Sequence, residues 1–457
     1  MAYEVDDILA GDFAHMRDLA VQTPRDAEDL LNNLKEIYRA IYFVDFARYD
    51  LDKVKAAAPG LQLDIVALQL HVRSQIPKWA ALGLLTRPVQ SALRDCFRAA
   101  RYGGDLIGEI ALGHPRLSPG QATFAGFSGS EPNLLVNPAF GTGAPQLQPG
   151  DVILQRGMIH NSAAIARIGD VDSQFSHVGM VANDKQGAPV VVEALIETGG
   201  SITPLNHNLG HNLGRAVLFR HKDGALAARA SELIYDHVAK SLGPGGEPIP
   251  YDFSMSLAHY DTLFCSKLIR LAYDLASNGA VKLPPYKTLL DMKNRDFLTR
   301  IGADATETFA PGDMELATDF DVVAEWRDFR VTSELRIKDL IMTKLFEWME
   351  NHGYRFRADL SINLISVGGR LSTKVSKGAQ ELVASITGGI VPPNMSGRAI
   401  GAVAMLHKTA EPIYRELEKL EDETIRNTGR QLHPREVFAE LERVRVRMGR
   451  RIGYLAR

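Results

Sequence analysis

Between residues 151 and 276 the sequence changes from strand-like to helical periodicity, and this change limits the possible folds more than any other feature. Four short runs rich in Val, Ile and Leu are bounded by Gly, Pro, Asn or Asp, which is typical of strands separated by turns. The runs are DVILQR, HVGMVAN, PVVVEAL and RAVLFRH. A helical pattern follows over residues 266–276, directly after Cys265. We therefore expect a small sheet followed by a helix that begins at a cysteine.

A helical pattern also precedes this segment. Residues 23–112 carry apolar positions at helical spacing, with Thr23 as the expected N-cap and Pro24 as the first helical residue. Pro77 and Pro88 are expected to divide a second helical run, because proline interrupts the hydrogen bonds of a helix interior. The N-terminal quarter of the chain is therefore interpreted as a bundle of helices.

The chain of 457 residues is too long for one compact core, so two or three domains are expected. Residues 113–150 are rich in Gly, Pro and Ser, which is typical of a linker, and the pattern is helical again after about residue 330. The last helix interleaves arginines with its apolar positions, a pattern found in helices that contact membranes or anionic partners. We expect a helical N-terminal region with linker at 1–140, a central domain at 148–330 and a helical C-terminal region at 335–457.

The bulk composition argues against nucleic acid as a partner. The formal net charge is -3 and 45% of the residues are hydrophobic, whereas an obligate nucleic-acid binder normally has a strong basic excess. The acidic start MAYEVDDILAGDF does not resemble a signal peptide. No uninterrupted apolar run reaches about 18 residues, the length that spans a membrane. We expect a chain that is cytoplasmic when synthesised.

Only two cysteines occur, Cys96 and Cys265. Two thiols cannot form a disulfide framework or a four-cysteine zinc site. Both are expected to be free, with Cys96 as a packed thiol inside a helix. Cys265 lies at the expected first turn of its helix, where the positive helix end lowers the pKa of a thiol. Backbone N–H groups at that turn can also stabilise a developing oxyanion.

His177 and Glu193 are the expected partners of Cys265. His177 opens the strand HVGMVAN and can accept the thiol proton. Glu193 is a charge within the apolar run VVVEAL, which is costly to bury without a partner. If the two strands pair as a hairpin, Glu193 can orient the imidazole as the third member of a triad. Taken singly, each residue also has a structural interpretation as a core thiol, a strand histidine or a solvated glutamate.

The order of these motifs resembles the circularly permuted NlpC-type, papain-like cysteine hydrolases, particularly the YiiX/YebB-like branch. The segments that carry the resemblance are GDVIL, SHVGMV, VVEA and FCSKLIRLAY, and Glu325-Trp326 resembles the close of the domain. In that family the histidine strand precedes the nucleophile helix and a glutamate follows the histidine. The resemblance therefore implies Cys265, His177 and Glu193 as catalytic residues. It also implies an α+β fold, with a permuted papain-like core and a small antiparallel sheet flanked by N- and C-terminal helical regions.

Four further residues are expected to line the site. Tyr251 and Asp252 resemble the tyrosine-containing stretch that precedes the nucleophile in the family, and Ser176 and Ser266 flank the catalytic pair. Phe264 departs from the family, in which a polar or tyrosine residue often precedes the cysteine. No hydroxyl is therefore expected at that position to stabilise an oxyanion.

No metal or cofactor is expected. His207 and His211 are four residues apart, but their segment NHNLGHNLG has the composition of a loop and offers no third ligand. His160 is interpreted as a surface-loop residue, with a place in the cleft as the alternative. The glycine-rich stretch GPGGEP lacks the features of a phosphate-binding loop.

The resemblance implies acyl transfer through a thioester on Cys265, and the acyl donor stays open between two classes. A lipid ester or amide, such as a phospholipid, is favoured, because lipid-acting relatives share the permutation and no cell-wall-binding repeat is present. The semi-apolar segment 382–406 and the basic last helix would also suit a membrane surface. The alternative is a peptidoglycan amidase or endopeptidase.

Two further hypotheses concern a different role and a different place of action. A domain of this fold can also be a non-catalytic binding module. A hydrolase of envelope components without a signal peptide can be an antibacterial effector that a specialised secretion system exports, with an immunity or secretion partner. The second hypothesis rests on the contrast between the N-terminus and the expected substrates.

Overall fold

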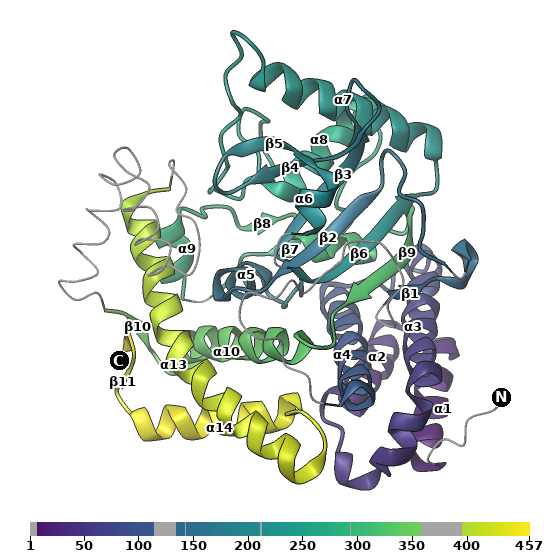
Figure 1. Cartoon of the computed structure of the whole chain (residues 1–457), viewed down its shortest axis with the longest axis vertical. Coiled ribbons are helices and arrows are strands. Elements are labelled where there is room, and N and C mark those ends of the chain that lie inside the picture. Colours follow the sequence, from purple (N-terminus) through teal and green to yellow (C-terminus); the bar gives the residue numbers. More distant parts are fainter. Residues whose placement is uncertain (1–6, 114–133, 142, 211–212, 293, 358–394) are drawn as a thin grey trace.

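The computed structural model describes residues 7–113, 134–141, 143–210, 213–292, 294–357 and 395–457. It is a mixed α and antiparallel β structure, in which helices surround one large sheet (Figure 1). The α-helices are α1 (Asp7–Val21), α2 (Ala27–Tyr42), α3 (Leu51–Ala81), α4 (Arg87–Leu112), α5 (His160–Ala166), α6 (Leu205–Leu209), α7 (Gly224–Leu242), α8 (Cys265–Ser277), α9 (Asp296–Ile301), α10 (Thr332–Asn351), α13 (Gly397–Thr428) and α14 (Pro434–Met448).

Among the described residues, the main sheet has seven strands in the order β1-β9-β6-β2-β3-β4-β5, and each neighbouring pair is antiparallel. Its strands are β1 (Leu134–Val136), β2 (Val152–Gly157), β3 (His177–Asn183), β4 (Pro189–Leu195), β5 (Gly199–Pro204), β6 (Leu213–His221) and β9 (Phe320–Arg327). Two small sheets contain β7 (Thr288–Leu289) with β8 (Glu307–Thr308), and β10 (Arg355–Phe356), β11 (Arg451–Ile452) and β12 (Leu455–Ala456). The four strands expected from the sequence are confirmed as β2, β3, β4 and β6.

The expected linker contributes a strand to this sheet. Within residues 113–150, β1 pairs with β9, and Leu135 lies opposite Glu325. The sequence did not predict this strand, because it is only three residues long, lies in a Gly- and Pro-rich segment and pairs with a strand far away in the sequence. The interpretation of the whole segment as linker is therefore wrong for β1, while residues 114–133 lie outside the described part of the chain.

The N-terminal helices differ from the expectation in their boundaries. The cap of α2 is Asp26, whose carboxylate accepts a hydrogen bond from the backbone N–H of Asp29, so Thr23 and Pro24 precede the helix. Pro77 lies inside α3, one turn before its end, and does not divide the run. Pro88 lies at the start of α4, where a missing N–H costs little.

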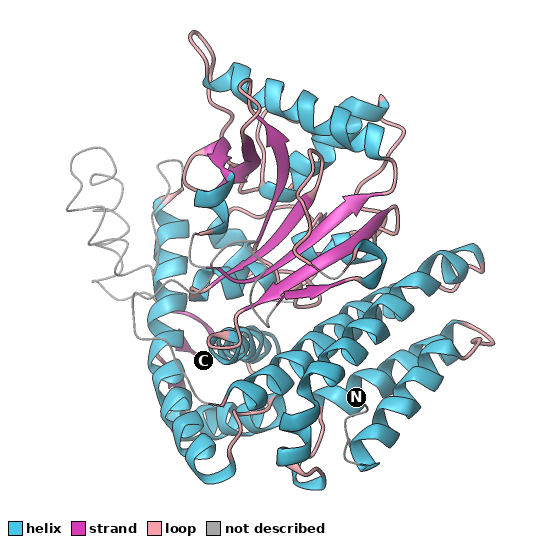
Figure 2. Cartoon of the chain, turned by 45° about the vertical axis from the view of Figure 1, so that its right-hand side comes forward, coloured by secondary structure: helices cyan, strands magenta, loops and turns pink. Residues whose placement is uncertain are grey.

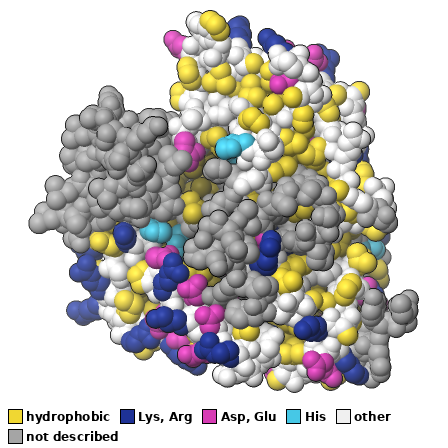
Figure 3. All heavy atoms as spheres, in the orientation of Figure 1, with side chains coloured by type: hydrophobic (Ala, Val, Ile, Leu, Met, Phe, Trp, Pro, Cys, Tyr) yellow, Lys and Arg dark blue, Asp and Glu magenta, His cyan; other side chains and the backbone are white. Residues whose placement is uncertain are grey.

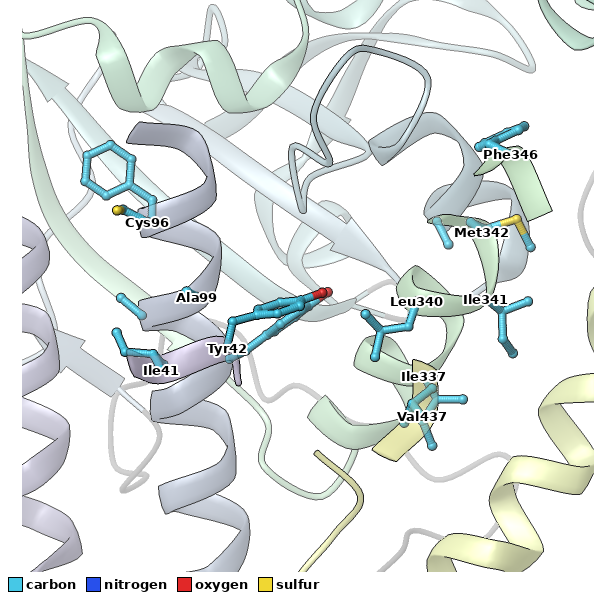
Figure 4. Close-up of a cluster of buried hydrophobic side chains, with 14 of the residues drawn as sticks. Ile41, Tyr42, Cys96, Ala99, Ile337, Leu340, Ile341, Met342, Phe346 and Val437 are labelled. Carbon is cyan, nitrogen blue, oxygen red and sulfur yellow. The ribbon is translucent and has the colours of Figure 1, made fainter. Parts of the chain in front are cut away.

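The two helical flanks share one hydrophobic core. Side chains of α2 and α4 pack in the same cluster as side chains of α10, α13 and α14. In Figure 4, Tyr42 lies between α4 and α10, with Ala99 on one side and Leu340 on the other. The N-terminal helices lie side by side below the sheet (Figure 2). Residues from the two ends of the sequence therefore stabilise one another.

One face of the sheet is divided into an apolar part and a charged part. Val152 and Leu154 of β2 face an apolar cluster that includes α7 and α8. Further along the same face, Arg156, Arg215 and Arg327 lie opposite one another on β2, β6 and β9. Adjacent like charges repel, so this row of arginines requires compensation.

Carboxylates from the helical flanks and from the sheet compensate the arginine row. Asp339 of α10 pairs with Arg156, and Asp105 of α4 pairs with Arg215. Arg327 pairs with Glu325 on its own strand at 2.9 Å. Gly104 allows the close approach of α4, because a Cβ there would lie 2.3 Å from the guanidinium of Arg327. These ion pairs join the flanks to the central sheet.

The described parts of the chain contain no helix that is both long enough and apolar enough to cross a membrane.

Candidate active site

Cys265 begins α8, as the sequence predicts. Its side chain is buried beside a cavity, and Phe264 before it has an extended backbone conformation. Phe264 has no side-chain acceptor, so the N–H groups in the first turn of α8 are not capped by that residue. The thiol therefore lies at the positive end of a helix, next to backbone donors that can stabilise an oxyanion.

His177 and Glu193 meet on the β3–β4 hairpin. Gly179 lies directly opposite Glu193, so His177, two residues earlier, is on the same face of the sheet. The His177 Nε2 atom lies 2.6 Å from a carboxylate oxygen of Glu193. A Cβ on residue 179 would lie 2.4 Å from a methyl group of Val191, which explains the glycine in SHVGMV.

The same histidine also forms a hydrogen bond with the Cys265 thiol. Burial alone would lower the pKa of His177, but the hydrogen bonds to Cys265 and Glu193 outweigh burial and raise it to about 10. Burial alone would raise the pKa of Cys265, but the hydrogen bond and charge of His177 lower it below its ordinary value of 9. The pair therefore favours a thiolate and an imidazolium.

Glu193 has a second partner that the sequence analysis missed. Asn208 on α6 donates a hydrogen bond to the Glu193 carboxylate at 2.9 Å, and Gln155 donates one to the side-chain oxygen of Asn208. Burial would raise the pKa of Glu193, but the hydrogen bonds from His177 and Asn208 help to lower it. The expectation of a loop for NHNLGHNLG is wrong for residues 206–209, which belong to α6 (Leu205–Leu209) and present Asn208 to the site.

Cys265 and His177 open onto a cavity of about 260 Å³. Its wall is mainly apolar and comes from both the central domain and the C-terminal flank. The apolar lining residues include Ile165 of α5, Phe253, Phe297 and Ile301 of α9, and Val403 and Leu406 of α13. A cavity of this kind accommodates an apolar part of a ligand next to the reactive thiol.

Of the four other residues expected to line the site, three line the cavity and one does not. Ser176, Tyr251 and Ser266 line the cavity, whereas Asp252 is not among its lining residues. Asp252 is buried and pairs with Lys267 of α8 at 2.7 Å. Its position suits a structural role, because it neutralises a buried lysine and holds the segment after Tyr251 against α8.

The remaining candidates lie in other environments. Cys96 is a free, buried thiol in α4 that lies 2.9 Å from the carbonyl oxygen of Leu34, and burial raises its pKa. His207 is on α6, and His211 lies outside the described residues. The interpretation of His160 as a surface residue is wrong, because it begins α5 and is only 2% exposed.

Residues 146–315 match the family described as "permuted papain-like amidase enzyme, YaeF/YiiX, C92 family". The match confirms the resemblance to permuted papain-like hydrolases for this segment, which contains Cys265, His177 and Glu193. It also supports a cysteine hydrolase or amidase in the broad sense. No curated protein and no solved structure matches the chain. The helical flanks lie largely outside the matched segment.

Proposed function

We propose that this protein is a cysteine acyl hydrolase or acyltransferase whose substrate is a lipid with an apolar acyl chain. The observation that carries the proposal is the apolar cavity of about 260 Å³ that opens at Cys265 and His177. An acyl chain in this cavity would gain about 0.8 kcal/mol for each buried methylene. Binding there would place the ester or amide carbonyl beside the thiol.

The chemistry follows from the ion pair of Cys265 and His177. The thiolate attacks the acyl carbonyl carbon, and N–H groups at the start of α8 stabilise the oxyanion. The C–O or C–N bond then breaks, and the imidazolium gives its proton to the leaving alcohol or amine. Neutral His177 next removes a proton from water or another acceptor, which attacks the thioester and releases the acyl product. Glu193 and Asn208 act as positioning residues, because they hold the imidazole orientation.

The charges around the cavity favour a lipid over peptidoglycan. None of the cavity-lining residues in the described part of the chain is a lysine or an arginine, and Glu197 is an acidic lining residue. Such a wall offers no cationic partner for the carboxylates of peptidoglycan stem peptides. A peptidoglycan amidase or endopeptidase remains the alternative outcome of the test.

The basic last helix supports membrane contact less than its sequence suggests. On α14, Arg443 pairs with Glu440 and Arg445 pairs with Glu442, and Arg447 pairs across to α13. Figure 3 shows acidic and basic side chains interspersed where Figure 1 places α13 and α14. Of the segment 382–406, residues 382–394 lie outside the described part of the chain. The lipid proposal therefore rests on the cavity.

The test compares purified wild type and Cys265→Ala on mixed bacterial phospholipids, on N-acyl amides and on purified peptidoglycan, with mass spectrometry of the products. Release of fatty acid that requires Cys265 would support the proposal. Cysteine-dependent release of stem-peptide fragments would assign the peptidoglycan alternative. No difference between the two proteins on any substrate would favour the binding-module hypothesis.

A second variant separates the chain-binding cavity from the catalytic groups. Val403→Trp would fill part of the cavity from α13, while Val446→Trp is the control at a 70% exposed position of α14. We expect Val403→Trp to lower activity on long-chain substrates by about tenfold or more. This is the loss in binding expected if about two methylenes of the acyl chain can no longer be buried in the cavity. Activity on acetyl esters should change little. Equal losses on both substrates would contradict an acyl-binding role.

Export as an effector, with an immunity or secretion partner, stays a prediction. Toxicity confined to periplasmic expression would support it. Equal or greater toxicity in the cytoplasm would count against it.

A further inference from the structure

A cluster of potential metal ligands lies where α5 meets α13. His160 begins α5, while His407 and Glu411 are one turn apart on the same face of α13. The three residues can each offer one ligand atom such that all the atoms lie within 4.8 Å of one another. None of them belongs to the catalytic triad. The sequence analysis missed the cluster because His160 precedes His407 and Glu411 by more than 240 residues.

Neither imidazole has all its nitrogens satisfied. His160 Nε2 lies 3.0 Å from a Glu411 oxygen, while His160 Nδ1 is buried and has no hydrogen-bond partner among the described residues. Within the described part of the chain, His407 Nδ1 is also buried without a hydrogen-bond partner, and the centroids of the two rings lie 5.4 Å apart. Two neighbouring imidazoles with orphaned nitrogens are costly to bury unless another group joins them.

We propose that His160, His407 and Glu411 bind a divalent transition-metal ion, with Zn²⁺ as the best fit, and that the ion clamps α13 against α5. Two imidazole nitrogens and one carboxylate oxygen are a common protein donor set for zinc, which takes its fourth ligand from water or a substrate. Ligand atoms about 2.0–2.1 Å from a tetrahedral zinc are separated by about 3.4 Å. Small side-chain rotations would therefore complete the site.

Neighbouring charges leave the site available to a cation. Arg415 donates a hydrogen bond of 2.8 Å to one carboxylate oxygen of Glu411, and the other oxygen faces His160. The nearby cation Lys338 forms an ion pair with Glu334 and donates a hydrogen bond to the carbonyl oxygen of Met158. One carboxylate oxygen can therefore serve as a ligand without breaking the pair with Arg415.

The cluster lies next to the cavity beside Cys265, so a bound ion would also affect the shape of that cavity. Asn161, next to His160, lines the cavity beside Cys265, and so does Leu406, next to His407. A metal that joins the two helices would fix the distance between two walls of this cavity. It would also connect the central domain to the C-terminal flank. Binding itself does not depend on which substrate the enzyme uses.

The experiment is calorimetric titration of the EDTA-treated full chain with ZnCl₂, supported by the visible spectrum with Co²⁺. We expect one ion per chain. His407→Ala and Glu411→Gln should weaken binding by more than about 100-fold, since loss of an outer-shell partner alone costs up to that much. Glu411→Gln removes the anionic ligand but can keep a hydrogen bond to His160. Weaker zinc binding by this variant would therefore reflect the lost metal ligand and not a change in folding.

The control is His15→Ala, which removes a His–Glu pair of the same kind at a distance from the site. His15 lies 2.7 Å from Glu36, at the surface of the N-terminal helices. This variant should bind zinc like the wild type. No binding by the wild type, or binding that His407→Ala and Glu411→Gln leave unchanged, would overturn the site.

Hydrogen exchange tests the clamp separately. Zinc should slow backbone exchange in the first half of α13 in the wild type and not in His407→Ala. Binding without any change in α13 exchange would overturn the clamp.

Discussion

The sheet has two parts that are built on opposite physical principles. Under α7 and α8 the inner face is apolar, and the polar groups that we propose as catalytic gather at the hairpin beside Cys265. Toward α4 and α10 the same face carries the row of buried arginines, each paired with a carboxylate. In one part Cys265 and His177 open onto a cavity, while the other part buries its charged groups between secondary-structure elements.

The difference teaches how assembly and reactivity are kept apart. The Coulomb attraction of a buried ion pair is largely offset by the desolvation of both charges, so the intact pair adds little stability. Removing one partner is strongly destabilising, because the other charge is then buried without compensation. They therefore select which helices can pack on the charged part. The apolar part leaves Cys265 and His177 free to change protonation. Mutations in the two parts should affect different observables.

The largest expected effect is on activity alone. Cys265→Ala should reduce turnover by about four orders of magnitude or more, because no other group replaces the nucleophile. The free energy of unfolding should change little. The matched control, Cys96→Ala, removes a packed thiol and should keep activity per folded molecule. Residual activity of Cys265→Ala near the wild-type level would break the distinction between the two parts.

Next in size is the loss of the positioning carboxylate. Glu193→Gln should lower kcat by about 10²- to 10⁴-fold, because the imidazole loses the group that orients it and stabilises its charge. Substrate KM should change far less. Steady-state kinetics with circular dichroism as a folding control measures this effect. Unchanged kcat would show that Glu193 is only a structural residue.

Glu325→Gln should affect stability instead of chemistry. Burial would raise the pKa of Glu325, but Arg101 and Arg327 outweigh it and lower the pKa to about 2. The depression from 4.5 corresponds to about 3 kcal/mol. This stability is present above pH 4.5 and is lost as the pH falls toward 2. Urea unfolding at neutral pH should show a loss of about this size.

The control for this prediction is a surface ion pair. Glu440→Gln, which breaks the exposed pair with Arg443, should cost less than about 1 kcal/mol. The wild type should also lose more stability than Glu325→Gln between pH 4.5 and pH 2. Equal stability of both variants would contradict the account of the charged part.

The smallest expected effect is a displaced titration. The alkylation rate of Cys265 should stay high below pH 9 and fall only as the pH drops through the lowered pKa of its thiol. In His177→Gln burial is no longer offset by His177, and only the hydrogen bonds from Ser266 and the Val178 backbone still lower the thiol pKa, so the midpoint should move upward. Cys96 serves as the internal control, since burial raises its pKa and keeps it unreactive. A midpoint at or above 9 in the wild type would contradict the ion pair.

Local patterns predicted the elements that carry the reactive groups. Short runs rich in Val, Ile and Leu between turn residues predicted β2, β3, β4 and β6, and helical spacing predicted α8 directly after Cys265. The expected hairpin turn was short, so the sequence predicted that Glu193 approaches His177 if the two strands pair, as they do. The charge of Glu193 within an apolar run was the signal of a buried partner.

Contacts between distant segments were not predictable in the same way. Asn208 reaches Glu193 from a short helix in a segment with loop composition, and β1 pairs with a strand almost 190 residues later. The wall formed by α13 and the burial of His160 also depend on tertiary packing. The polar residues in NHNLGHNLG were the only signal for Asn208.

The central claim is that Cys265 carries the acyl group as a thioester. The most direct measurement is intact-protein mass spectrometry after brief exposure to a phospholipid or an N-acyl amide, followed by peptide mapping. We predict a mass increase of one acyl group on Cys265, which hydroxylamine removes and which Cys265→Ala lacks. Acylation at another residue, or substrate turnover by Cys265→Ala, would contradict the account.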